Sequence, residues 1–138
     1  MVLEQKDIRQ ILSHRYSFIL VDRVKYMDED RIVAVKNITS SDINLWGHFE
    51  DDPIYPGVLL IESCSQAGGI LLSNQKTSRG YIAQINEFKF LSFVRPGDSV
   101  HIEATINKVV GQYAKVSVAA LVEDKIIAKG EVMYFFDK

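Results

Sequence analysis

Two residues in the first half of the chain have the types and the setting that acid–base chemistry needs. Glu62 is a carboxylate within an apolar run, and His48 lies upstream of it between Gly47 and Phe49. A buried carboxylate is costly unless it is hydrogen-bonded or neutralised, and burial favours its protonated form, which can act as a general acid. A neutral imidazole can act as a general base near neutral pH. Together they could remove a proton from one carbon and protonate a leaving group on the next.

Each residue also has a plainer interpretation. Glu62 could lie on a solvated helix face, and His48 could be a packed or solvent-facing side chain without chemistry. The apolar flanks of Glu62, which are Leu59–Ile61 and Ala67, favour burial. The loop after His48 runs through Ile54-Tyr55-Pro56-Gly57 into a helix N-terminus, where free N–H groups and the helix dipole can stabilise an oxyanion. These settings favour the chemical interpretation.

The residues around Glu62 predict a helix over Val58–Leu72. Pro56 suits a position at or just before its first turn. Apolar side chains cover most of its circumference, so we expect this helix to be buried nearly all round. Polar or small residues follow Glu62 at helical spacing and predict a narrow polar stripe on one face: Ser65, Gln66, Gly69 and Ser73.

The remaining elements must form a sheet that this helix covers. A short helix is expected over Asp7–Leu12 and a structured loop over residues 41–57. Runs rich in β-branched and aromatic residues predict strands at Phe18–Met27, Arg31–Ser40, Tyr81–Val94, Ser99–Val109, Tyr113–Val122 and Lys125–Phe136. Short links between them predict antiparallel neighbours. We therefore expect an α+β fold, an antiparallel sheet of about six strands wrapped around one long central helix.

The composition limits the classes of function. A chain of 138 residues without repeats or linkers suits a single domain over residues 1–138. A net charge of −2 argues against nucleic-acid binding, and the charged N-terminus predicts neither a signal peptide nor a membrane span. The single cysteine, Cys64, excludes an internal disulfide and indicates a cytoplasmic location. One Cys and three scattered His residues give no metal-ligand spacing.

Several spaced blocks of the sequence resemble the FabZ-type 3-hydroxyacyl-[acyl-carrier-protein] dehydratases. Gly47-His48-Phe49, then Pro53–Leu59, then Glu62 and Gln66 resemble the signature GHFP…P-x-x-PGV-L-x-x-E-x-x-x-Q of that family. Two more blocks resemble its PHRYPFLLVDR opening and its RPGD turn: His14–Arg23 and Arg95–Asp98. The likeness covers most of the chain.

This resemblance implies a hot-dog fold and the dehydration of a 3-hydroxyacyl chain, carried on the phosphopantetheine of acyl carrier protein, to the trans-2-enoyl chain. By position, His48 would be the base and Glu62 the acid. The substrate-binding residues would be Gly57, whose N–H polarises the thioester carbonyl, Ile54, whose carbonyl orients His48, and Gln66. No metal or redox cofactor is expected.

The resemblance also implies partners. In this family the His and Glu of one site come from different subunits of a homodimer, and dimers often assemble as a hexamer. Glu62, where the related FabA group has Asp, favours dehydration without obligatory isomerisation. Four basic residues are candidates for contact with the acidic carrier protein, with a solvated surface as the alternative: Lys76, Arg79, Lys89 and Arg95.

Some residues depart from the family pattern or have two interpretations. Glu50-Asp51-Asp52 replaces the usual Pro-Gly-x and makes the loop after His48 more acidic. Within Ser63-Cys64-Ser65, the cysteine either lines the acyl tunnel or, as we favour, packs in the core. His14 is expected to be structural, packed against Arg15 and Tyr16, and His101 to lie on an exposed strand surface.

Two other functions stay open at this stage. A hot-dog thioesterase also places a carboxylate on its central helix but uses it to activate water for hydrolysis. A non-catalytic acyl-carrier-binding partner subunit is the second alternative, although such a subunit would be expected to lack His48 or Glu62. The sequence does not distinguish primary fatty-acid synthesis from a polyene or polyketide pathway.

Overall fold

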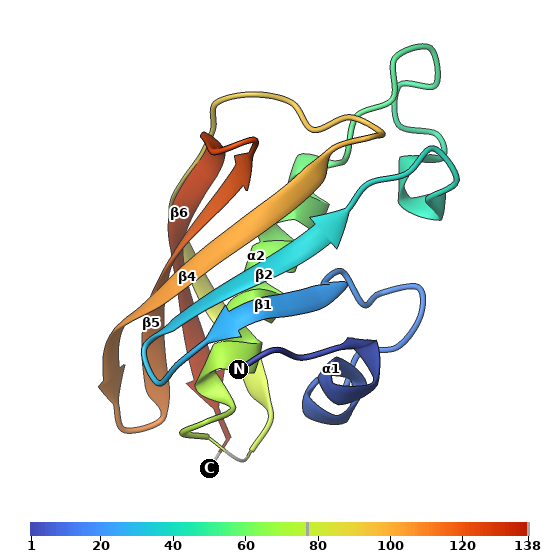
Figure 1. The fold of residues 1–138 in the computed structure, drawn as a ribbon. Coiled ribbons are helices and arrows are strands. Elements are labelled where there is room, and N and C mark those ends of the chain that lie inside the picture. Colours follow the sequence, from blue (N-terminus) through green and yellow to red (C-terminus); the bar gives the residue numbers. More distant parts are fainter. Residues whose placement is uncertain (77, 138) are drawn as a thin grey trace.

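The computed structural model describes residues 1–76 and 78–137, and its main feature is a six-stranded sheet curved around one long helix (Figure 1). Every strand pair is antiparallel, and the strand order is β1-β2-β4-β5-β6-β3. The elements are α1 (Gln5–Ile11), β1 (Arg23–Met27), β2 (Arg31–Asn37), a 3-10 turn (Ile43–Leu45), α2 (Gly57–Leu72), β3 (Gly80–Phe90), β4 (Ser99–Val110), β5 (Tyr113–Val122) and β6 (Lys125–Phe136). The α+β fold expected from the sequence is confirmed.

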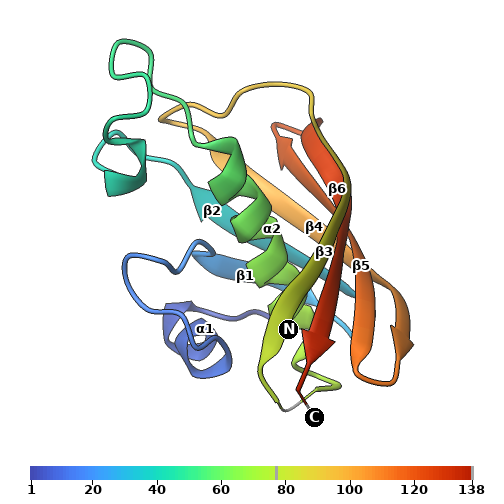
Figure 2. The same ribbon diagram turned by 180° about the vertical axis from the view of Figure 1, so that it is seen from behind.

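Helix α2 lies across the concave face of the sheet and packs against β2, β3, β4 and β5 (Figure 2). The strands alternate, so that every second side chain points at the helix, as Val100, Ile102 and Ala104 do on β4. Leu60 and Leu71 of α2 are buried against them. Burial of one such aliphatic side chain contributes about 1.5–3 kcal/mol, so this contact holds the two layers together.

The expectation that α2 is buried nearly all round holds for most of the helix, because ten of its sixteen residues are buried and only Val58 among the sixteen is exposed. The sheet covers one side of the helix, and in Figure 2 no strand of the described chain lies across the opposite side. Val58 is 73% exposed there, and Glu62 and Gly69 are half-buried. The predicted polar stripe is partly covered on that side: Ser65 and Gln66 are buried, and Tyr134 of β6 donates to the Ser65 carbonyl oxygen.

The first two strands are shorter than predicted. Phe18–Asp22 lies outside β1, because the Gln66 side chain and not a neighbouring strand binds the backbone at Phe18 and Leu20. Strand β2 ends at Asn37 because Ile38 turns to exchange two backbone hydrogen bonds with the turn at Gly97-Asp98, with N···O distances of 2.8 and 3.0 Å.

One strand neighbour was predicted wrongly. The turn at Pro96-Gly97-Asp98 was expected to join antiparallel neighbours, but β3 pairs with β6 and β4 pairs with β2. The link between β3 and β4 is long enough to cross from one edge of the sheet to its interior, because β3 already ends at Phe90. Short links do join β1 to β2, β4 to β5 and β5 to β6 as predicted.

The two edges of the sheet differ. Leu3 exchanges two backbone hydrogen bonds with Val24 and so covers part of the outer edge of β1. Within the described part of the chain, no strand pairs with the outer edge of β3. Tyr81, Ile82 and Phe90 are exposed along β3. An unpaired edge with exposed apolar side chains is a ready surface for another strand.

Two adjacent glycines of α2 give a matched test of the packing. A methyl group at Gly68 would meet the hydroxyl of Tyr134, which is buried and donates to the Ser65 carbonyl oxygen at 2.6 Å. A methyl at Gly69 would point into open space. We expect Gly68→Ala to lower the free energy of unfolding by about 1–3 kcal/mol through overpacking. Gly69→Ala should raise it by up to about 1 kcal/mol through helix propensity.

Urea unfolding of both variants at one protein concentration measures the difference. Equal changes in the free energy of unfolding for the two variants would contradict this account of the helix–sheet contact.

Candidate active site

A groove with a volume of about 870 Å³ runs along the open side of α2. The predicted polar stripe of the helix forms one of its walls, with Glu62, Ser65, Gln66, Gly69 and Ser73. The other walls are largely apolar and come from the segment after α1 and from the ends of β3 and β6: Leu12, Phe18, Tyr81, Ile82, Tyr134 and Phe136. A groove of this kind suits a ligand with an apolar chain and a polar reacting end.

Glu62 is the carboxylate of this groove, and its side chain is 18% exposed. The Nε2 amide of Gln66 donates to its Oε2 at 3.0 Å. Nε2 of His14 lies 3.6 Å from the same oxygen. In the described residues, no hydrogen-bond donor binds the other oxygen, Oε1. One carboxylate oxygen is therefore held by the protein and the other is available.

Gln66, predicted as a substrate-binding residue, lines the groove and is held there by protein partners. It is 2% exposed, and its Oε1 accepts from the Leu20 N–H at 2.8 Å. Its Nε2 donates to the Phe18 carbonyl oxygen at 2.8 Å and to Glu62. Since both N–H groups of the amide have protein acceptors, this side chain is placed to orient Glu62 and the Phe18–Leu20 backbone, and it has no donor left for a substrate.

His48 lies in the loop before α2 with its ring in a fixed orientation. Nδ1 lies 2.9 Å from the Ile54 carbonyl oxygen, so this nitrogen carries the proton and Nε2 keeps a lone pair. The neighbours of His48 both have left-handed backbones, with φ of 75° at Gly47 and 57° at Phe49. A left-handed phenylalanine costs about 1–2 kcal/mol, and strain of this kind gathers at functional sites.

The loop that carries His48 is anchored by buried groups. Tyr55 is buried, and its hydroxyl oxygen lies 3.0 Å from the hydroxyl oxygen of Ser63. Its backbone N–H donates to the Val94 carbonyl oxygen at 2.7 Å. Burial raises the pKa of the Tyr55 hydroxyl, which therefore stays protonated. Lys36, 9% exposed, places Nζ 3.5 Å from Oδ2 of Asp42, whose Oδ1 accepts from Asn44 at the 3-10 turn.

The N-terminus of α2 presents free donors next to this loop. Leu59 and Leu60 donate to the Pro56 carbonyl oxygen, whereas no acceptor among residues 1–76 and 78–137 binds the N–H of Gly57 or Val58. A Cβ at position 57 would lie 3.2 Å from the Phe90 ring, so glycine allows this close approach. Two unpaired N–H groups at the positive end of a helix suit a developing negative charge.

No hydrogen bond, ion pair or shared groove joins the two predicted catalytic residues in the described chain. Glu62 lines the groove, but His48 is not among the residues that line it. Figure 1 shows the segment between β2 and α2 extending beyond the end of the sheet, away from the groove wall at α1. His48 and the α2 N-terminus form one half of a candidate site, and Glu62 with its groove forms another.

Sequence reasoning missed two residues here. His14 was expected to pack against Arg15 and Tyr16, but Tyr16 is exposed and His14 lies at the groove beside Glu62. Its place in the family-like opening block was the available signal. Lys36 was counted only as a strand residue, and a lysine at an inward-facing strand position was the signal for a buried ion pair.

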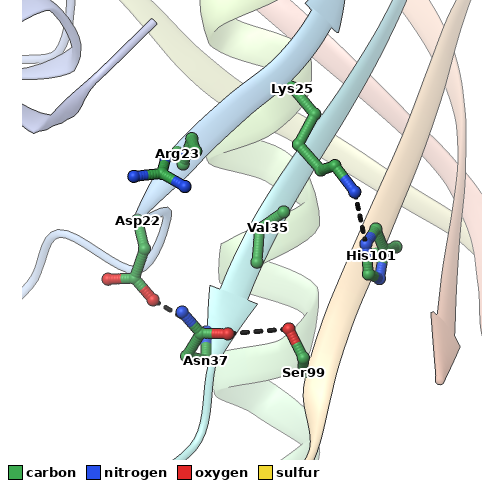
Figure 3. A pocket seen from close by; sticks show the side chains of 7 residues that line it. All are labelled: Asp22, Arg23, Lys25, Val35, Asn37, Ser99 and His101. Atoms are coloured by element: carbon green, nitrogen blue, oxygen red, sulfur yellow. Dashed lines mark hydrogen bonds between the residues drawn. The ribbon is translucent and has the colours of Figure 1, made fainter. Parts of the chain in front are cut away.

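Cys64 and His101 both lie outside the groove. Cys64 is fully buried in the core and does not line the groove, as the favoured core-packing interpretation predicts. Burial raises the pKa of its thiol to about 12. His101, expected to be exposed, is half-buried on the outer sheet face, where its Nε2 lies 3.3 Å from Lys25 Nζ (Figure 3).

The hollow around His101, about 380 Å³, contains side chains of both charges. Asp22, Arg23 and Lys25 line it together with Asn37 and Ser99, which are hydrogen-bonded to each other in Figure 3. Arg23 is already paired with Glu4 at 2.9 Å. These contacts mark a polar strand surface rather than a second reacting centre.

Across 1–76 and 78–137, no three His, Cys, Asp or Glu side chains gather in a group that could hold a metal ion. No helix in that part of the chain has both the length and the apolar character needed to cross a membrane.

Known proteins resemble this chain over nearly its whole length. The model of the FabA-like domain matches residues 12–131. The 3-hydroxyacyl-[acyl-carrier-protein] dehydratase FabZ of Clostridium perfringens (strain SM101 / Type A) is 40% identical over 131 residues, which are 93% of this chain and 94% of the relative. The FabZ dehydratase of Caldanaerobacter subterraneus subsp. tengcongensis is 40% identical over 136 residues, 96% of each chain.

Solved structures share the fold at much lower identity. The dehydratase heterocomplex ApeI:P from Xenorhabdus doucetiae superposes with a TM-score of 0.81 at 11% identity, over 95% of this chain and 91% of that one. A hypothetical thioesterase with coenzyme A from Streptococcus pneumoniae TIGR4 gives 0.72 at 16% identity, over 95% and 94%. These likenesses confirm the hot-dog fold that the sequence predicted.

The Lys36 ion pair generates a prediction about the His48 loop. Lys36→Met leaves the Asp42 carboxylate without its buried partner, so we expect a loss of about 3 kcal/mol in the free energy of unfolding. Adding Asp42→Asn should restore part of this loss, because the unpaired charge is removed while the cap oxygen remains. Thermal and urea unfolding measure the cycle.

Lys115→Met is the matched control, since Lys115 is exposed on β5. It should change stability by less than about 0.5 kcal/mol. A similar loss for Lys36→Met and Lys115→Met would show that the ion pair does not stabilise the loop.

Proposed function

We propose that this chain, which belongs to the FabA-like family, dehydrates 3-hydroxyacyl chains on acyl carrier protein to trans-2-enoyl chains in fatty-acid or related polyketide or polyene biosynthesis. The observation that carries this proposal is the geometry at the start of α2. There the His48 ring is fixed through Nδ1 by the Ile54 carbonyl oxygen, next to the unpaired N–H groups of Gly57 and Val58. A base beside an oxyanion donor is what removal of a proton next to a thioester carbonyl requires.

The first step forms charge on the thioester oxygen. The proton on the carbon next to the carbonyl is weakly acidic, so its removal needs stabilisation of the enolate-like oxygen. His48 takes this proton at Nε2, the nitrogen that keeps a lone pair. The Gly57 N–H donates to the carbonyl oxygen as the negative charge grows.

The second step expels water. The electron pair of the broken C–H bond forms the new carbon–carbon double bond, and the bond from the β-carbon to the hydroxyl oxygen breaks. Glu62 supplies a proton to that oxygen through Oε1, and the product is water. His48 then holds one extra proton and Glu62 lacks one, so proton exchange with solvent restores both. The overall reaction changes no oxidation state, and for this reason we expect no redox cofactor.

The working unit in this proposal is a homodimer. His48 and Glu62 lie in different half-sites of one chain, so a second copy has to supply the missing partner. The outer edge of β3, with Tyr81, Ile82 and Phe90 exposed, is the surface that suits pairing between copies. The family resemblance implies three such dimers in a hexamer, and the single cysteine suits a cytoplasmic enzyme.

Among the basic residues considered for carrier contact, two lie at the groove. Lys76 and Arg79 line it beyond Ser73. Arg95 and Lys89 do not line the groove: Arg95 lies 3.2 Å from Asp52, and Lys89 lines a separate hollow together with acidic side chains. We therefore propose Lys76 and Arg79 as the contacts for an acidic carrier protein. Parallel assays with a carrier-bound substrate and with a short thioester measure how much these carrier contacts contribute to substrate binding.

A thioesterase stays the second candidate because one structural neighbour carries that name. A thioesterase would release a free acid from the thioester, whereas a dehydratase releases an enoyl thioester of unchanged length. Product analysis by mass spectrometry separates the two reactions. Neither product, from a folded protein, would favour the non-catalytic partner subunit.

Mixing two inactive variants tests the reaction and the shared site together. We expect His48→Ala and Glu62→Gln each to be inactive as pure proteins. In a mixture with free subunit exchange, half of the dimers are hybrid and each has one intact site, so about one quarter of wild-type activity should return. Enoyl formation from 3-hydroxyacyl carrier measures it.

No recovery, with subunit exchange shown by a mass-tagged copy, would place both residues of one site in the same chain. The loss of activity in each single variant would still support the roles of His48 and Glu62.

The oxyanion donor can be removed without breaking the helix. Gly57 is the first residue of α2, where proline fits because its N–H has no partner in the helix, and Pro56 before it has an extended ψ of 133°. We expect Gly57→Pro to lower kcat by about 100-fold through loss of this N–H. Gly57→Ala is the control, since it adds the same contact with Phe90 and keeps the N–H. Similar kcat values for the two variants would argue against the donor role.

A further inference from the structure

We propose that His14 is a positioning residue for Glu62: it fixes Oε2 of the carboxylate and so leaves Oε1 as the oxygen that faces the substrate hydroxyl. The inference rests on the proposed dehydratase function for its effect on turnover. It starts from the approach of Nε2 of His14 to within 3.6 Å of Oε2 of Glu62, at the groove that both residues line.

The two oxygens of Glu62 have unequal surroundings. Oε2 accepts from Gln66 at 3.0 Å and also faces His14, whereas no donor in the described chain binds Oε1. Gln66 stands one helical turn away on α2, while His14 comes from the segment between α1 and β1. A carboxylate held by one donor can still rotate about its last side-chain bond, and a second donor from another direction restricts that rotation.

The other nitrogen of the His14 ring indicates where the ring proton is. Nδ1 is buried and, among the described residues, has no hydrogen-bond partner. An N–H at Nδ1 would have no acceptor among these residues, whereas Nε2 faces a carboxylate oxygen, which accepts hydrogen bonds. The neutral ring therefore carries its proton on Nε2, the atom that faces Glu62. His14 acts as a donor toward the carboxylate and presents no lone pair to it.

The segment that carries His14 is itself held by the same glutamine. Gln66 binds the Phe18 carbonyl oxygen and the Leu20 N–H, each at 2.8 Å, so the backbone after His14 is fixed relative to α2. The ring of Phe18 packs beside the His14 ring, with centroids 5.7 Å apart. The gap of 3.6 Å is longer than a hydrogen bond, and such contacts commonly shorten when a substrate fills the site.

Three variants separate positioning from packing. His14→Phe keeps a ring of similar size beside Phe18 but has no donor. His14→Gln keeps an N–H donor at a comparable reach. His101→Phe makes the first change on the outer sheet face, away from the groove. All three should fold, as judged by circular dichroism and by unfolding temperature.

We expect His14→Phe to lower kcat by about 10- to 100-fold with little change in KM, because a misplaced carboxylate affects the reaction more than binding. His14→Gln should recover most of that loss, and His101→Phe should leave both constants unchanged. Unchanged kcat in His14→Phe, or an equal loss in His14→Gln with both proteins folded, would overturn the proposal.

Crystal structures of the wild type and of His14→Phe test the same claim without turnover. We expect one carboxylate orientation of Glu62 in the wild type and a rotated or split orientation in the variant. An unchanged Glu62 would overturn the positioning role. Lack of dehydration by the wild-type protein would overturn the proposed function alone, since this structural comparison does not depend on it.

Discussion

The buried amide of Gln66 is the contact on which the arrangement of the groove depends. One side chain binds the backbone at Phe18 and Leu20 and also donates to Glu62, so it joins the N-terminal segment to the central helix and orients the carboxylate. A buried amide with all of its N–H groups paired is rigid, because any displacement leaves a polar group without a partner. Gln66 therefore both connects the N-terminal segment to α2 and orients the carboxylate of the candidate site.

The hot-dog sheet explains why the site is divided. It covers only one side of α2, so the helix has an open side where Glu62 can meet a ligand, and a free end where Gly57 presents its N–H. His48 lies beyond that end, on a loop held by Lys36 and Tyr55 at the rim of the sheet. The side of α2 that packs against the sheet stabilises the fold, and the other side and the N-terminal end are available for the reaction.

Local sequence predicted the features that local physics decides. The bounds of β5 and β6 match because the turn between them, Glu123-Asp124, takes left-handed backbones that end both strands sharply. Glu62 could be identified from the sequence because a buried carboxylate in an apolar helix is costly unless it is hydrogen-bonded or neutralised. The position of β3 beside β6, and of His14 beside Glu62, was not predictable, because both contacts join segments that only the finished fold brings together.

The burial of Cys64 has a consequence for redox chemistry. The thiolate, not the thiol, reacts with oxidants and electrophiles, and a thiol with a pKa raised to about 12 is almost entirely protonated at neutral pH. The side chain is also fully enclosed between α2 and the sheet. Oxidative damage to the sulfur of this cysteine therefore requires the helix to separate from the sheet first, and the folded protein shields its single thiol as long as its core stays closed.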